Sequence, residues 1–500
     1  MAKEYLYGAA VQGIQQFIFQ TNKLKDIAGA SELVENICTE KFKELIGCGN
    51  LDNDNRAIIN AAGNVKYRFA SKEKCEEVVL MFPKLVAEYA PGITLSQAVV
   101  EINEGDDFAT KVDELENALR TQRNRPMAST TWGMMGIERS HTTGKPVTHI
   151  AGDEHLDAAT YAKQFHQEGK KRNVLKLPKV AFNIDDLNYA DVAIDPEDMT
   201  TKNDWVAVIH ADGNGLGQIV QKVGHEMTRF KDFSQKLDKA TKAAAVAAFE
   251  NIKKKYSWEK IPIRPIVLGG DDFTVICRGD LALDYVAEFI THFEQETAKH
   301  LSEYIKNVFT EGNVRDRLTA CAGIAYVKSS YPFYYAYNLA EALCTRAKKD
   351  AKAGIDTTKE LPQSCIMFHK VQDSFVENYD EIVKRELTPC MHKTFAFGPY
   401  YINSKDGRWT IEVLNDNVNK LNGEEGNAVK SGLRNWMGLL HGDQNIAEQK
   451  LNRFKSLYKN GSPLRSFIDE VTTWSKQGED EVIPAYDLLA LHTIIYQKTK

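Results

Sequence analysis

The sequence predicts an α+β protein with two βαββαβ layers and a helical C-terminal region. The order strand, helix, strand, turn, strand, helix, strand occurs twice, which is the ferredoxin-like succession. The second succession carries a Gly-Gly-Asp-Asp turn between two apolar, β-prone runs, a pattern typical of a tight hairpin. We therefore expect four regions: a first layer (1–125), a connector (126–203), a second layer (204–370) and a helical domain (371–500).

Composition narrows the class of protein. A hydrophobic fraction of 43% and a charged fraction of 26% are typical of soluble globular chains. No apolar run approaches the roughly 20 residues of a membrane span, and no signal-peptide core follows Met1, so we expect a cytoplasmic protein without membrane partners. The net charge of −6 argues against a globally basic nucleic-acid binder. The eight scattered cysteines include no Cys-x-x-Cys pair, which predicts reduced thiols and no zinc site.

The first layer reads clearly from strand and helix periodicity. We expect strands at 5–12, 57–62, 65–70 and 93–101 and helices at 27–45, 72–88 and 106–122. The hairpin tip is Ala62-Gly63-Asn64-Val65, which offers no carboxylate. This layer is therefore interpreted as a degenerate copy of the second, with the same fold but without metal ligands.

The connector, residues 126–203, has four prolines and few long apolar periods. One helix is expected near 156–169. His141, His149 and His155 fall in this region, and a metal site is one interpretation of them. A solvated loop is favoured, because no pair has the short spacing that places two ligands on one helical face.

The second layer begins with an apolar strand at 205–211 that runs into Asp212 and a glycine-rich turn. A helical pattern follows from Gln218, and a long helix is expected at 228–255. The Gly269-Gly270-Asp271-Asp272 hairpin comes next. A helix at 281–307, a strand at 318–327, a helix from about Pro332 and an apolar piece at 365–369 that would close the sheet complete it.

Three carboxylates carry the predicted chemistry. Adjacent strand residues face opposite sides, so glycine-permitted turn geometry is what brings Asp271 and Asp272 together. Mg²⁺ and Mn²⁺ take oxygen ligands of this kind. An ordinary solvated turn is the alternative, but Asp212 supplies a third acid beside a turn and helix start suited to phosphate. This order is typical of a nucleotidyl-transfer palm, in which two metals bridge the attacking and leaving oxygens.

The chain resembles the polymerase-cyclase large subunit of type III CRISPR effector complexes, a family related to GGDEF cyclases. The first and second layers correspond to the two palm domains of this family. In the first palm the resemblance rests on residues 11–19 and 27–33. In the second it rests on 212–217, 268–273, Ala340-Glu341 and Ala347-Lys348. Residues 430–434 and 439–442 look like the family's helical bundle.

The resemblance implies that two ATP molecules bind between the palms and that only the second palm holds metal. Asp212, Asp271 and Asp272 would be catalytic and bind two Mg²⁺ or Mn²⁺ ions, with the Gly213 carbonyl as a further ligand. The other residues expected to contact nucleotide are Asn214, Gly215, Gly217, Gly269, Gly270, Lys348 and Ser31. Lys348 would meet a phosphate, or else complement the helix dipole. Ser31 would touch a base, or else satisfy donors at a helix N-terminus.

The implied function is synthesis of a cyclic or linear oligoadenylate from ATP by 3′–5′ bond formation. Guide RNA, target RNA and other type III subunits are the implied partners. A stand-alone synthase, which could be a homo-oligomer, and a nucleotide-binding scaffold without turnover are the alternatives. A diguanylate cyclase is disfavoured, since such enzymes pair two identical palms. Relatives often begin with an HD nuclease domain, and this chain starts at the first palm, so we expect no DNA cleavage.

Overall fold

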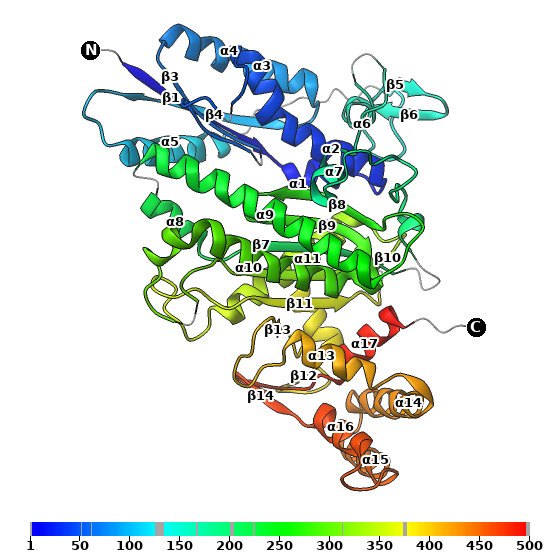
Figure 1. Cartoon of the computed structure of the whole chain (residues 1–500). Helices are drawn as coiled ribbons and strands as arrows, with labels where there is room; N and C mark the ends of the chain where they lie inside the picture. Colours follow the sequence, from blue (N-terminus) through cyan, green and yellow to red (C-terminus); the bar gives the residue numbers. More distant parts are fainter. Residues whose placement is uncertain are drawn as a thin grey trace.

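The computed structural model describes residues 3–51, 53–61, 63–125, 135–166, 169–200, 205–223, 226–312, 314–373 and 378–496. The predicted α+β class is confirmed: two sheet-and-helix layers lie one above the other, with helices of the C-terminal region below the second layer (Figure 1). Ala62 of the first hairpin tip, residues 126–134 and 201–204 at the expected region boundaries, and the last residues of the chain lie outside the described residues.

The first palm has the ferredoxin-like topology. Its elements are β1 (Glu4–Gln12), α1 (Ile14–Ile18), α2 (Leu24–Asn36), a π-helical turn (Ile37–Lys41), α3 (Phe42–Ile46), β2 (Ala57–Ala61), β3 (Asn64–Phe69), α4 (Lys72–Tyr89), β4 (Thr94–Ile102) and α5 (Phe108–Arg123). The strand order is β2-β3-β1-β4, with antiparallel neighbours. This is the βαββαβ arrangement that the periodicity predicts.

Side chains alternate across the first sheet, and each face has its own cover. Tyr5 and Tyr7 of β1 belong to a core that includes α2 and α4. Leu6, between them, belongs to a second cluster with Leu115 and Leu119 of α5. The period of two in β1 therefore places α5 on the opposite face from α2 and α4.

The connector differs from the expectation of one helix in a loop region. It contains β5 (Val147–Ala151), β6 (Glu154–Asp157), α6 (Ala158–Gln164) and α7 (Lys176–Phe182), and β5 and β6 form a hairpin. His149 and His155 thus lie in strands rather than in loops. The helix begins at Ala158 because Asp157 caps it, accepting hydrogen bonds from the Ala159 and Thr160 amides.

The second palm repeats the topology of the first. Its elements are β7 (Trp205–Gly213), α8 (Leu216–Val223), α9 (Met227–Lys255), β8 (Ile263–Gly269), β9 (Asp272–Arg278), α10 (Ala282–Lys306), β10 (Ala320–Lys328), α11 (Phe333–Ala351) and β11 (Cys365–Lys370). The sheet order β13-β11-β10-β7-β9-β8 contains the same 2-3-1-4 pattern in β8-β9-β7-β10. The prediction that 365–369 closes the sheet is wrong, because β13 (Tyr400–Tyr401) pairs beyond β11.

The two faces of the second sheet have different neighbours. Ala207 and Ile209 of β7 pack in the core formed with α9 and α10. Val206 and Val208, which alternate with them, belong to the core shared with the first palm and α11. Residues 210 and 212 continue this second register, so they face the first palm.

The C-terminal region is mainly helical, as predicted, with a small sheet added. Its elements are α12 (Tyr379–Ile382), a π-helical turn (Val383–Leu387), β12 (Lys393–Thr394), α13 (Ile411–Asn419), α14 (Gly423–Leu440), α15 (Gln444–Ser456), α16 (Pro463–Thr472), β14 (Ser475–Gln477), β15 (Asp480–Val482) and α17 (Ala485–Ile495). Helix α16 ends at Thr472, because the chain then pairs as β14 with β15. Across the described residues, no helix is both long and apolar enough to cross a membrane.

Candidate active site at the palm interface

The acidic hairpin joins β8 to β9 as the sequence predicts. Gly269 pairs with Asp272, which leaves Gly270 and Asp271 as a two-residue turn. Gly270 has φ 61°, a left-handed conformation that glycine adopts without steric cost. The turn places Asp271 at the tip and Asp272 at the first position of β9.

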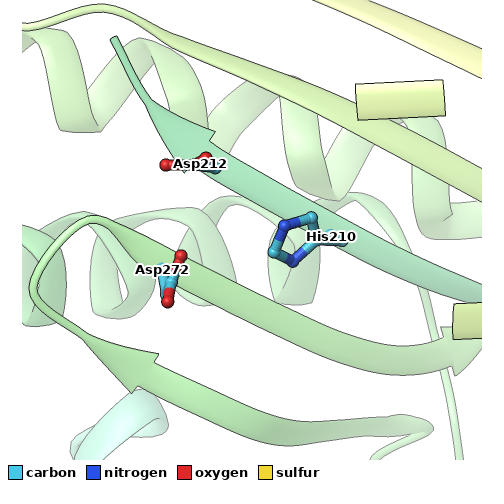
Figure 2. A group of neighbouring side chains, drawn as sticks. All are labelled: His210, Asp212 and Asp272. Atoms are coloured by element: carbon cyan, nitrogen blue, oxygen red, sulfur yellow. The ribbon is translucent and has the colours of Figure 1, made fainter. Parts of the chain in front are cut away.

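Asp212 lies beside this hairpin because β7 and β9 are neighbours, with Ala211 opposite Phe273. Asp212 and His210 are two positions apart on β7, so their side chains share one face of the sheet. Ligand atoms of His210, Asp212 and Asp272 all lie within 4.8 Å of one another. Figure 2 shows the three side chains on the two adjacent strands.

Asp271 approaches the end of β7 over a glycine. A Cβ atom added to Gly213 would lie 2.9 Å from the Asp271 Cβ and 3.4 Å from its Oδ2. Only a residue without a side chain allows this approach at position 213. The structure therefore brings the three predicted acids, Asp212, Asp271 and Asp272, to one place.

The acids are crowded and partly withdrawn from water. Burial, then the charge of Asp212, raises the pKa of Asp272 to about 6, and Lys348 partly offsets this. Burial and repulsion by Asp212 and Asp272 raise the pKa of Asp271 well above its usual range. Crowded carboxylates of this kind favour a bound cation, and their oxygen atoms are ligands suited to Mg²⁺ or Mn²⁺. The residues present therefore fit a divalent metal site.

Lys348 reaches the acids from α11. Its Nζ forms an ion pair with Asp212 and donates a hydrogen bond of 2.9 Å to the Gly213 carbonyl. Burial alone would lower the pKa of Lys348, but the interaction with Asp212 raises it overall, so this side chain is charged at neutral pH. Lys348 also lies in the last turn of α11, so its charge complements the helix dipole as well.

The glycine-rich turn that follows Asp212 packs closely against neighbouring residues. Gly215 has φ 79°, and a Cβ there would lie 2.3 Å from Leu361 and 2.8 Å from Phe309. Asn214 is 1% exposed, and its Nδ2 donates to Thr319 Oγ1 at 3.1 Å. The same Nδ2 lies 3.4 Å from Cys321 Sγ, so the Asn214 side chain is held in the interior. Gly217 opens the first turn of α8, with no atom within 4 Å of an added Cβ.

A cavity of about 250 Å³ lies between the palms, next to the acids. Ile14, Phe19 and Ser31 line it from the first palm, and His210, Asp272 and Tyr337 line it from the second. Ser31 is in the middle of α2, so the helix N-terminus alternative does not apply. Its hydroxyl donates to the Ile266 carbonyl of β8 and so joins the two palms.

Two residues of this site were missed by sequence reasoning. His210 reads as part of an apolar strand, although its i, i+2 spacing to Asp212 could have indicated a shared face. Tyr337 of α11 stacks on Phe19 with ring centroids 4.8 Å apart and accepts a hydrogen bond of 2.8 Å from Gln15. No local pattern links these residues, because the contact joins positions more than 300 residues apart.

The second palm matches a known protein family. Residues 205–355 match the family described as Cas10/Cmr2, second palm domain. No curated protein matches the chain. The predicted resemblance to the polymerase-cyclase large subunit of type III CRISPR complexes is confirmed, since this match covers the motifs at 212–217, 268–273 and 340–348.

Solved structures show that the fold extends over the whole chain. Similar structures include the Csm1–Csm4 cassette in complex with AMPPNP (TM-score 0.56, 13% identity, 99% of this chain and 70% of that chain). The cassette with pppApA gives a TM-score of 0.54 at 13% identity, covering 99% of this chain and 69% of that chain. The cassette with cA4 gives 0.53 at 12% identity, covering 99% and 70%. At these identities the likeness concerns the fold.

Proposed function

We propose that this chain, whose residues 205–355 match the Cas10/Cmr2 second palm domain family, is a metal-dependent nucleotidyltransferase that joins ATP into cyclic or linear oligoadenylates. The observation that carries the proposal is the convergence of Asp212 on β7 with Asp271 and Asp272 of the β8–β9 hairpin, beside Lys348 and a cavity between the palms. The similar Csm1 chains were solved with AMPPNP, pppApA and cA4, which supports adenine nucleotides as the ligand class.

Asp212, Asp271 and Asp272 would hold one or two Mg²⁺ or Mn²⁺ ions, with the Gly213 carbonyl beside them. When bound, such ions supply Lewis-acid polarisation of the α-phosphate and make the attacking 3′-hydroxyl more acidic. In the reaction, a bond forms between the 3′-oxygen of one nucleotide and the α-phosphorus of another. The bond from that phosphorus to the β-phosphate bridge breaks, and pyrophosphate leaves.

The residues of this chain contribute positioning and charge. Lys348 is a charged donor at the acids and would contact the phosphates that approach them, because its ion pair with Asp212 stays partly exposed, at 18% for Lys348 and 34% for Asp212. The mostly apolar cavity beside Asp272 has the character of a base-binding pocket. Phe19 and Ser31 line the pocket from the first palm. The first palm would thus bind nucleotide without supplying catalytic carboxylates.

Nucleotide binding at a shared interface gives a physical reason for two palms. Gln15 and Phe19 of the first palm contact Tyr337 of α11, and α11 also carries Lys348. A nucleotide between the palms would therefore touch elements tied to both. This arrangement holds the reacting groups in a fixed orientation, which is the main source of rate in phosphoryl transfer.

Membership of a type III effector complex is the context we favour over a stand-alone synthase. The chain aligns over 99% of its length with Csm1 chains solved together with Csm4. This likeness includes the C-terminal helices, which a synthase palm pair does not need for chemistry. Guide RNA and target RNA would then be partners, and copurification of RNA and sibling subunits tests this context.

The test of the activity uses purified protein with ³²P-labelled ATP and Mn²⁺, alone and with sibling subunits and target RNA. We expect labelled oligoadenylates and pyrophosphate, and their loss in Asp271→Ala/Asp272→Ala. The matched control is Asp185→Ala/Asp186→Ala, an adjacent acid pair exposed in the connector. Absence of product in every combination, or unchanged product in the Asp271→Ala/Asp272→Ala variant, contradicts the proposal. Nucleotide binding without pyrophosphate release would favour the scaffold alternative.

A further inference from the structure

We propose that His210 is a nitrogen ligand of the catalytic cation, and that it makes this site prefer transition-metal dications such as Mn²⁺ over Mg²⁺. The inference rests on the proposed function in one respect: it takes the acidic site to be a cation site. It goes beyond that function by adding a ligand of a different chemical type. The acids alone offer only oxygen atoms.

His210 lies on the face of the sheet that carries the acids. It lies two residues before Asp212 on β7 and opposite Thr274 of β9, so it faces the same side as Asp212 and Asp272. Donor atoms of the three residues lie within 4.8 Å of one another. Two ligand bonds of about 2.1 Å span at most about 4.2 Å, so side-chain rotation by about half an ångström would gather the donors around one ion.

The imidazole ring of His210 is held in one orientation by its neighbours. His210 Nδ1 lies 3.1 Å from Thr274 Oγ1, and the ring packs edge-to-face on Tyr337 with centroids 5.6 Å apart. One ring nitrogen is therefore occupied by a hydroxyl, which leaves Nε2 for a cation. Metal-binding histidines are commonly held in this way, with the second nitrogen hydrogen-bonded to a neighbouring group. His210 is 9% exposed, so the ring has little freedom to turn elsewhere.

A nitrogen donor changes which divalent cations the site binds most tightly. Mg²⁺ is a hard cation that binds oxygen and gives up its water reluctantly. Imidazole favours first-row transition metals, with affinity rising from Mn²⁺ through Co²⁺ to Ni²⁺. A His210 ligand therefore raises the affinity for Mn²⁺ and Co²⁺ while leaving the affinity for Mg²⁺ nearly unchanged. Asp212 and Asp272 supply the charge that both kinds of ion need.

The alternative is that His210 is an interior histidine satisfied by Thr274 alone. Two readouts on the tag-free full chain without nucleotide separate the cases. Pulsed electron paramagnetic resonance of bound Mn²⁺ detects a directly coordinated ¹⁴N nucleus. Competition titrations give the dissociation constants of Mn²⁺ and Mg²⁺. Neither readout requires turnover.

We expect a ¹⁴N coupling in the wild type and in His300→Gln, a matched control on α10 outside the site, and its loss in His210→Gln. His210→Gln should weaken Mn²⁺ binding about 10- to 100-fold and Mg²⁺ binding less than about 3-fold. Thr274→Val should keep the coupling and weaken Mn²⁺ binding about 10-fold, because the ring loses its anchor.

Absence of the ¹⁴N coupling in Mn²⁺-saturated wild type overturns the inference, and so does its persistence in His210→Gln. If His210→Gln does not fold, the wild-type spectrum decides alone. Failure of this inference is distinguishable from failure of the proposed function. Oligoadenylate synthesis with an all-oxygen Mn²⁺ spectrum refutes only the role of His210. A nitrogen-coordinated Mn²⁺ without any product refutes only the synthase.

Discussion

The substitution Gly213→Ala tests the placement of Asp271 with a single methyl group. The added Cβ would lie 2.9 Å from the Asp271 Cβ and 3.0 Å from Leu216 Cδ1. Carbon atoms in contact prefer about 3.5–4.0 Å, so one side must move by roughly 0.5–1 Å. The backbone at Gly213 is not left-handed, so alanine itself is tolerated there. The displaced element is therefore the hairpin tip or the start of α8.

We expect this displacement to cost activity far more than stability. A misplacement of about 1 Å at a reacting centre lowers rates about 100-fold, while local overpacking costs about 1–3 kcal/mol. The assay is pyrophosphate release under single-turnover conditions, with thermal melting of the same preparation. The matched control is Gly438→Ala in the C-terminal region, where no atom lies within 4 Å of the new Cβ and alanine favours helix α14 by about 0.5–1 kcal/mol. Activity of Gly213→Ala within twofold of Gly438→Ala would refute the position of Asp271.

Three further predictions concern the charges and the two hairpin tips. Burial and Asp212 raise the pKa of Asp272 to about 6, so the folded chain holds this proton more tightly than the unfolded chain. Stability of the metal-free protein should therefore fall as the pH rises from about 4 to about 6. Melting at pH 7.5 in EDTA should show a higher Tm for Asp272→Asn than for the wild type. An equal or lower Tm for the variant contradicts the pKa shift. Lys348→Met should lower kcat/KM about 100-fold, whereas Lys349→Met, its exposed neighbour, should match the wild type, and equal losses from both would exclude a specific role. Asn64→Ala at the first hairpin tip should change only nucleotide affinity, measured by equilibrium binding, and a loss of turnover as complete as in Asp272→Ala would end the division of labour between the palms.

Much of the fold can be predicted from the sequence, because the residues that specify these elements are close together in the chain. Gly269-Gly270-Asp271-Asp272 between apolar runs specifies a two-residue hairpin, and the long helix at 227–255 has an unbroken period. Elements that depend on distant partners were not readable. The two-residue strand β13 exists because Tyr400 and Tyr401 pair with β11, and nothing in their own sequence requires it.

The residues of the site also divide into those with a local sequence signal and those whose contacts depend on distant parts of the chain. Asp212 lies next to the end of β7, Asp271 lies in the turn before β9 and Asp272 begins β9, and the order of strands brings them together. Ser31 reaches the interface, but its bond to the Ile266 carbonyl depends on how two layers pack. Asn214 was expected to contact the nucleotide, which stays a prediction, and its buried side chain donates a hydrogen bond to Thr319 Oγ1, a partner more than 100 residues away that its own sequence does not indicate.

The most direct test of the account is a crystal structure of the chain with Mn²⁺ and a non-hydrolysable ATP analogue, recorded at the manganese absorption edge. We predict anomalous density among Asp212, Asp271 and Asp272, an α-phosphate beside it, and the base in the cavity between the palms. Nucleotide bound elsewhere, or manganese held by other residues while these three acids stay free of metal, would contradict the central claim.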